Sequence, residues 1–149
     1  MKSSIGNIAV IGIGVIGTGW IIRFLYNQKK IKVYDPNIEQ KKNLLKEIKR
    51  VEPTLKKIYK KKINLLKQLE FSKSLKDAVK NADLIQENAP ENEKLKKNLI
   101  KEISEHSKIN SIIASSSSGL LPSKIQSKCK NPKRLIIAHP FNPVYLLPL

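Results

Sequence analysis

Short apolar runs alternate with longer polar stretches along the whole chain. Six apolar runs predict strands at residues 8–12, 31–35, 69–72, 82–87, 111–115 and 134–139. The polar stretches between them predict helices at residues 17–27, 38–68 in one or two pieces, 75–81, 92–106 and 122–129. Buried strands joined by helices are typical of a doubly wound, Rossmann-type α/β fold. We therefore expect a mostly parallel sheet with helices on both faces.

The length and composition indicate a single domain. The chain has 149 residues, and we expect residues 1–149 to form one nucleotide-binding domain. Its apolar stretches are shorter than the ~18 residues of a membrane span, and its first apolar run lacks the layout of a signal peptide. Cys129 is the only cysteine, and no Cys/His cluster has zinc spacing. We expect a cytoplasmic protein with no membrane partner and no metal.

The net charge of +17 raises nucleic acid as a candidate partner. Only three of the 29 basic residues are arginines, namely Arg23, Arg50 and Arg134. Base and phosphate recognition favours the planar fork of arginine over the lysine ammonium. The densest lysine run, residues 56–68, has apolar residues near helical spacing, so its lysines are expected on a solvated helix face. A nucleic-acid partner is therefore not expected, and nucleic-acid binding stays the weakest alternative.

The first predicted strand runs into a glycine motif, Gly12-x-Gly14-x-x-Gly17. A bare pattern of this kind is weak evidence, but here it follows a strand and opens a helix. In that setting the first glycine allows a tight turn, the second lets the backbone approach a pyrophosphate, and the third permits close helix packing. The N-terminus of the helix then holds the phosphates. The motif predicts a dinucleotide cofactor.

An acidic residue ends the second predicted strand. Asp35 lies 18 residues after Gly17, close to the ~20 expected for a carboxylate that binds the adenosine ribose hydroxyls. A carboxylate there repels a 2′-phosphate, which favours NAD over NADP, although Lys41 and Lys42 are near enough to soften the discrimination. The alternative is a glycine-rich turn followed by a chance aspartate.

Two later strands end in polar residues that suit proton transfer. Four serines, residues 115–118, follow one strand, and His139 ends the next. Ligands of open α/β sheets bind beyond the carboxyl ends of the strands, so Ser118 and His139 are expected at one edge. A histidine can take a hydroxyl proton while the hydride leaves for a nicotinamide. The alternatives are a polar turn for the serines and a turn residue bonded to backbone for the histidine.

Four segments together resemble one family: "IGIGVIGTGW", "QENAPE", "ASSSSGLLPS" and "HPFNPVYLLPL". This combination resembles the 3-hydroxyacyl-CoA dehydrogenase superfamily, and within it the N-terminal domain of L-carnitine dehydrogenases. The resemblance spans the whole chain. The fatty-acid branch differs in the last two segments, and gulonate dehydrogenases share the serine stretch but vary around the "HPFNP" segment.

The resemblance implies roles for individual residues. It implies an NAD-binding loop formed by Gly12, Gly14, Val15, Ile16, Gly17, Thr18 and Gly19. It places Asp35 on the adenosine ribose, Glu87 beside the nicotinamide half, and Asn142 near both nicotinamide and substrate. It implies that Ser118 bonds the substrate oxygen and that His139 is the catalytic base. The plainer alternatives are a surface carboxylate for Glu87 and a turn former for Asn142.

The resemblance also implies a part that this chain lacks. Relatives continue beyond residue 149 into a glutamate that orients the histidine and then into an all-helical domain. That domain closes the substrate cleft and makes the dimer, so a homodimer is expected only if it is supplied. We expect the chain alone to bind NAD and to turn over substrate poorly. Carnitine carries a quaternary ammonium, a group that proteins commonly hold over aromatic faces. Most of that site would come from the missing domain, and Tyr145 is the nearby aromatic that we nominate in this chain.

The implied activity is NAD-dependent oxidation of a small 3-hydroxy acid, with carnitine favoured as the substrate. Two other enzyme activities stay open, on 3-hydroxyacyl-CoA or on L-gulonate. An NAD-binding remnant or sensor without catalysis is the alternative of a different class.

Overall fold

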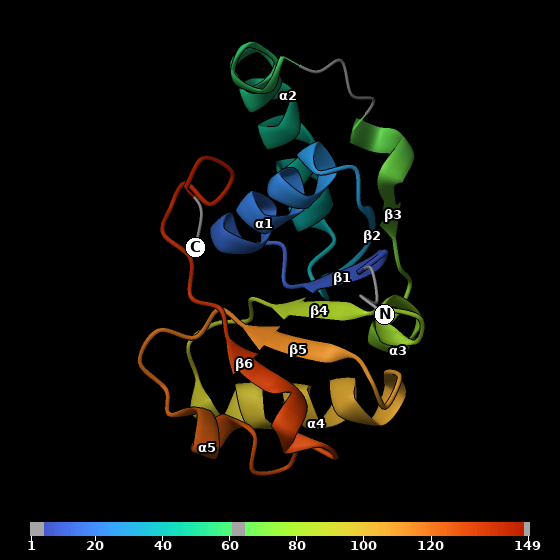
Figure 1. Cartoon of the computed structure of the whole chain (residues 1–149), viewed down its shortest axis with the longest axis vertical. Helices are drawn as coiled ribbons and strands as arrows, with labels where there is room; N and C mark the ends of the chain where they lie inside the picture. The colour runs from blue at the N-terminus through green and yellow to red at the C-terminus, as the bar shows by residue number, and fades with distance from the viewer. Residues whose placement is uncertain (1–4, 61–64, 148–149) are drawn as a thin grey trace.

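The sheet has all its strands in parallel (Figure 1). The computed structural model describes residues 5–60 and 65–147, and within them it has six strands: β1 (Asn7–Ile11), β2 (Lys30–Tyr34), β3 (Leu69–Phe71), β4 (Leu84–Glu87), β5 (Ile112–Ser115) and β6 (Leu135–Ile137). Their order across the sheet is β3-β2-β1-β4-β5-β6, and each neighbouring pair is parallel. This confirms the predicted doubly wound α/β class.

Helices cover both faces of the sheet (Figure 1). On one face lie α1 (Val15–Tyr26) and α2 (Glu39–Tyr59), and on the other lie α3 (Leu75–Val79), α4 (Glu93–His106) and α5 (Pro122–Ile125). Two short 3₁₀ turns, η1 (Leu65–Gln68) and η2 (Pro132–Arg134), precede β3 and β6. None of the helices in the described part of the chain is long and apolar enough to cross a membrane.

The apolar run of β1 is explained by its central place. Ile8 and Val10 pack in the core beneath α1 and α2, whereas Ala9 and Ile11 pack in the core beneath α3, α4 and α5. A strand buried on both faces reads as a continuous apolar run rather than an alternating one. By contrast, α2 buries one stripe against the sheet and exposes its lysines; the stripe consists of Leu44, Ile48, Val51 and Leu55.

The strand order creates a crevice at one edge. β1 has β2 on one side and β4 on the other, so the connections leaving β1 and β4 run to opposite faces. Ligands of open α/β sheets bind at such a switch point, beyond the carboxyl ends of the strands. The glycine motif, which follows β1, therefore lies at the switch point.

Several predicted ends differ from the observed ones. The helix predicted over residues 38–68 ends at Tyr59, because Lys60 adopts a left-handed conformation with φ of 50°. Residues 61–64 of that prediction lie outside the described residues, and residues 65–68 form a 3₁₀ turn. The helix predicted to residue 129 ends at Ile125, since successive tight turns follow it. Strand β6 ends at Ile137, ahead of His139.

Candidate functional site

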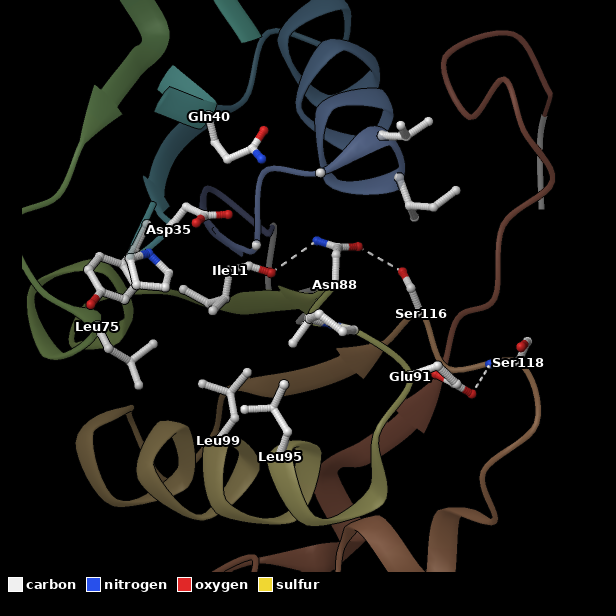
Figure 2. Close-up of a pocket in the computed structure, with 18 of the residues that line it drawn as sticks. Ile11, Asp35, Gln40, Leu75, Asn88, Glu91, Leu95, Leu99, Ser116 and Ser118 are labelled. Atoms are coloured by element: carbon white, nitrogen blue, oxygen red, sulfur yellow. Dashed lines mark hydrogen bonds between the residues drawn. The ribbon is translucent and has the colours of Figure 1, made fainter. Parts of the chain in front are cut away.

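A cavity of about 790 Å³ opens beyond the carboxyl ends of the strands (Figure 2). Its size is within the range of small-molecule and cofactor sites. The glycine loop, the end of β2, the loop after β4 and the loops after β5 and β6 all contribute to its wall. The sequence-predicted residues that line it are Gly12, Gly14, Val15, Ile16, Asp35, Ser118 and His139.

The glycines of the motif do different work. Gly12 has φ of +85°, and a Cβ on it would lie 2.9 Å from the backbone of Asn88. A Cβ on Gly17 would overlap the carbonyl oxygen of Gly12, so the third glycine lets helix and loop pack closely. Gly14 is the N-cap of α1, and nothing lies within 4 Å of the position that its Cβ would take. The N-terminus of α1 therefore opens into the cavity and fits a diphosphate.

Asp35 joins the end of β2 to the glycine loop. One of its carboxylate oxygens accepts a hydrogen bond of 2.7 Å from the Ile13 N–H, and the other accepts one of 2.8 Å from the Asn37 N–H. A carboxylate oxygen can accept more than one hydrogen bond, so the Asp35 carboxylate can still bind a ribose hydroxyl. Its position in the cavity wall fits the predicted role.

Three of the four serines bond to the loop that follows β4. Their hydroxyls donate in turn, Ser115 to Glu87, Ser116 to Asn88 and Ser117 to Glu91. Asn88 also donates to the carbonyl oxygen of Ile11, which links this loop to β1 (Figure 2). These three hydroxyls therefore hold the ends of β1, β4 and β5 together.

The fourth serine is the exception. Ser118 is exposed in the cavity wall, and within residues 5–60 and 65–147 it bonds Glu91 through its backbone N–H and not through its hydroxyl. Its hydroxyl is therefore free to contact a ligand. Position along the run thus separates one available hydroxyl from three structural ones.

Glu91, which the sequence reasoning did not select, lies in the same wall. One of its oxygens accepts from the Ser117 hydroxyl at 2.6 Å and from the N–H groups of Ser118 and Gly119, both at 2.9 Å. Figure 2 shows the contact with Ser118. Burial alone would raise the pKa of Glu91, but these donors and the nearby Lys96 ammonium hold it below its ordinary value. Its place in the "QENAPE" segment was the only signal in the sequence.

Glu87 does not line the cavity. Its side chain is fully buried beneath α4, where the ammonium of Lys96 lies 2.8 Å from one carboxylate oxygen and 3.0 Å from the other. Lys96 also donates to the carbonyl oxygen of Ala89 at 2.9 Å. A buried ion pair needs both of its partners, and the Glu87 carboxylate is directed at Lys96 rather than into the cavity. The expected role of Glu87 beside the nicotinamide stays a prediction.

His139 lies in the cavity wall with Ser118. The two residues follow neighbouring strands, β6 and β5, and the N–H of Ala138 still bonds to the Ser115 carbonyl at 2.8 Å. His139 is exposed, and among the described residues no hydrogen bond holds its imidazole. The structure thus brings the two predicted groups to one cavity without orienting the ring.

The remaining predicted residues do not line this cavity, although the cavity that three of them line shares Gly14 and Val15 with it. Thr18, Gly19 and Asn142 line a second cavity of about 470 Å³ between α1, α2 and the C-terminal segment, with Tyr145 in its wall. The Thr18 hydroxyl donates to the Ile13 carbonyl at 3.2 Å. A Cβ on Gly19 would lie 2.8 Å from Val144, so this glycine lets the C-terminal segment pack on α1.

The described part of the chain has no group of three or more histidine, cysteine, aspartate or glutamate side chains placed to hold a metal ion. The polar groups of the main cavity are instead backbone N–H groups, hydroxyls, carboxylates, one imidazole and the side-chain amides of Gln40 and Asn88.

A sequence profile identifies the domain type. The profile described as "3-hydroxyacyl-CoA dehydrogenase, NAD binding domain" matches residues 7–149.

Curated relatives and a solved structure extend this match. The chain is 46% identical over 148 residues to an L-carnitine dehydrogenase of Bacillus cereus, covering 99% of this chain and 45% of that protein. It is 44% identical over 142 residues to an L-carnitine dehydrogenase of Oceanobacillus iheyensis, with 95% and 46% covered. It is also similar, at 28% identity and a TM-score of 0.86, to 5-formyl-3-hydroxy-2-methylpyridine 4-carboxylic acid 5-dehydrogenase, an NAD+-dependent dismutase, with 97% and 47% covered. The chain therefore spans less than half the length of these proteins.

Proposed function

The chain belongs to the 3-hydroxyacyl-CoA dehydrogenase NAD-binding domain family, and from this premise we propose that it is the nucleotide-binding half of an L-carnitine 3-dehydrogenase. The cofactor of this family of domains is NAD. Carnitine is favoured because the two L-carnitine dehydrogenases share 46% and 44% identity with the chain, against 28% for the solved pyridine carboxylate dehydrogenase. The proposed reaction converts L-carnitine and NAD into 3-dehydrocarnitine, NADH and a proton.

One observation carries this proposal: a single cavity at the switch point joins the glycine loop, Asp35, Ser118 and His139. The open N-terminus of α1 at Gly14 would bind the diphosphate, and Asp35 would bind the adenosine ribose. The negative charge of Asp35 would disfavour a 2′-phosphate and select NAD over NADP.

The chemistry at the other end of the cavity uses two side chains. When bound, NAD supplies the acceptor for the hydride from the carbinol carbon. The free hydroxyl of Ser118 would hydrogen-bond the substrate oxygen. The His139 imidazole would accept the hydroxyl proton of the substrate, a role that typically contributes ~10²–10⁴-fold to a rate. Because no hydrogen bond holds the ring among the described residues, an orienting group from outside them would raise this contribution.

The proposal extends to the setting of the enzyme. We place it in the cytoplasm, with a small 3-hydroxy acid as substrate and without a nucleic-acid or membrane partner. The all-helical domain that the resemblance implies would complete the site and make a homodimer. The alternative substrates for the same pair of side chains are 3-hydroxyacyl-CoA and L-gulonate. The alternative of a different class is an NAD-binding protein that uses the cavity for the cofactor and catalyses no reaction.

A complementation assay tests this function. The chain is mixed with the separately produced C-terminal part of the Bacillus cereus relative, and NADH formation is followed with L-carnitine, L-gulonate and 3-hydroxybutyryl-CoA. We expect turnover with L-carnitine only, little or none from the chain alone, and loss of turnover in His139→Ala with unchanged thermal unfolding. Faster turnover of either competing substrate, or full activity in His139→Ala, would contradict the assignment.

A further inference from the structure

Glu91 accepts hydrogen bonds from the loop of residues 117–120, which we call the serine loop. Besides the Ser117 hydroxyl and the N–H groups of Ser118 and Gly119, the same carboxylate oxygen faces the Leu120 N–H at 3.4 Å. Four donors therefore converge on one oxygen atom. Hydrogen bonds to a charged acceptor are stronger than those between neutral groups, so this carboxylate holds the loop more firmly than an ordinary turn contact would.

Among residues 5–60 and 65–147, Glu91 is the residue that bonds the N–H groups at the tip of this loop. Ser118 and Gly119 are both exposed. Nothing lies within 4 Å of the position of a Cβ on Gly119. Packing at Ser118 and Gly119 themselves therefore adds little. Their backbone is held by the hydrogen bonds to Glu91, between the buried Ser117 and Leu120, which packs against the core beneath α4.

A buried ammonium lies next to the Glu91 carboxylate. Its second oxygen lies 3.8 Å from the ammonium of Lys96, whose side chain is 1% exposed and is fixed by Glu87 and by the Ala89 carbonyl. A buried, fully bonded ammonium has little freedom to move. Glu87 thus fixes Lys96, Lys96 lies against Glu91, and Glu91 bonds the backbone of Ser118.

We propose that Glu91 is a positioning residue that fixes the Ser118 loop for substrate binding. This inference rests on the substrate-binding role proposed above for Ser118. It assigns the effect of Glu91 on the reaction to the orientation of Ser118, rather than to general stability of the fold.

Amide hydrogen exchange tests the loop directly in the 149-residue chain. Wild type is compared with Glu91→Ala, Glu91→Gln and the control variant Glu93→Ala. Glu93 lies two residues after Glu91, and its carboxylate accepts a hydrogen bond from the Lys97 ammonium. Exchange at Ser118 and Gly119 should be about tenfold faster or more in Glu91→Ala, intermediate in Glu91→Gln, whose amide oxygen can still accept, and unchanged in the control.

Protection of the core amide of Val10 verifies that each variant is folded. Exchange at Ser118 and Gly119 within about twofold of wild type in folded Glu91→Ala would overturn the proposal. If Glu91→Ala does not fold, exchange at Ser118 and Gly119 is compared between Glu91→Gln and wild type. Faster exchange in Glu91→Gln is then expected, and unchanged exchange would overturn the proposal.

A double-mutant cycle tests the link to the reaction. In the complemented enzyme, Glu91→Ala should lower kcat/KM for L-carnitine by about tenfold or more when Ser118 is present, but by less than about threefold in the Ser118→Ala background. An equal loss in both backgrounds would show that Glu91 acts without Ser118 and would overturn the proposal. If complemented wild type turns over none of the substrates, the proposed function fails, while hydrogen exchange still decides whether Glu91 positions the loop.

Discussion

Replacing Lys96 by methionine should destabilise the domain strongly. The ammonium of Lys96 and the carboxylate of Glu87 are 1% and 0% exposed, and the substitution would leave Glu87 buried with only the Ser115 hydroxyl and the Ala89 N–H as donors. Breaking a buried pair in this way typically costs about 3–5 kcal/mol. At about 2–4 °C per kcal/mol for a chain of this size, Tm should fall by roughly 6–20 °C.

The matched control breaks an exposed pair. Lys56 and Glu52 on α2 are 47% and 32% exposed, so Lys56→Met should change the free energy of unfolding by only about 0–1 kcal/mol. The double variant Glu87→Gln/Lys96→Met leaves no charge buried and should recover most of the loss. Urea unfolding followed by the fluorescence of Trp20 measures all four proteins. A loss below about 1 kcal/mol in Lys96→Met, or no recovery in the double variant, would refute the reasoning.

Further perturbations probe the glycine loop, cofactor choice, acid stability and charge. Asp35→Ala should weaken NAD binding by about 1.5–3 kcal/mol and narrow its advantage over NADP, as parallel titrations would show, whereas an unchanged ratio would contradict the ribose role. Gly17→Ala should lower Tm because its Cβ overlaps the neighbouring turn, while Gly14→Ala should keep Tm but weaken NADH binding; equal Tm values for both variants would contradict this difference. The Asn7 N–H chiefly holds the pKa of Asp83 below its ordinary value in the folded chain. The ionised carboxylate therefore stabilises the fold above the unfolded-state pKa, and this stabilisation is lost as the pH falls through the folded-state pKa. Asp83→Asn should flatten this dependence of the free energy of unfolding on pH, and an unchanged dependence would contradict the assignment. Duplex DNA should bind only weakly, with a Kd of ~10⁻⁴–10⁻⁶ M at physiological salt that weakens further as salt rises, and tight sequence-selective binding in a salt titration would contradict this.

The sequence predicted the elements better than their ends. Apolar runs reveal buried strands because both faces of a strand such as β1 must be apolar. The end of α2 depends on the left-handed conformation of Lys60, which a lysine side chain does not signal. The order of the strands was not predicted, because the apolar pattern alone does not specify which strands become neighbours.

Position at a strand end predicted which residues reach the cavity, but it did not predict the direction in which each side chain points. Gly14, Asp35, Ser118 and His139 follow strands and reach the cavity. Glu87 also ends a strand, but it is on the same face as the buried Ile85, two residues earlier, and therefore points to α4. The alternation of β4 could have indicated this direction only after the face covered by α4 was known.

We propose that NAD binds at the carboxyl edge of the sheet, and a titration of the isotope-labelled chain with NAD, followed by backbone amide NMR shifts, locates the bound cofactor. A useful contrast is built into the fold, since a cavity of about 510 Å³ at the opposite edge is lined by Lys30, Lys32, Lys67 and Lys108 and could attract a diphosphate by charge alone. Binding at the carboxyl edge should give saturable shifts centred on Gly12–Ile16, Asp35 and Glu91, with little change around these lysines. Shifts centred on the lysine-lined cavity, or no saturable shifts at the glycine loop, would contradict it.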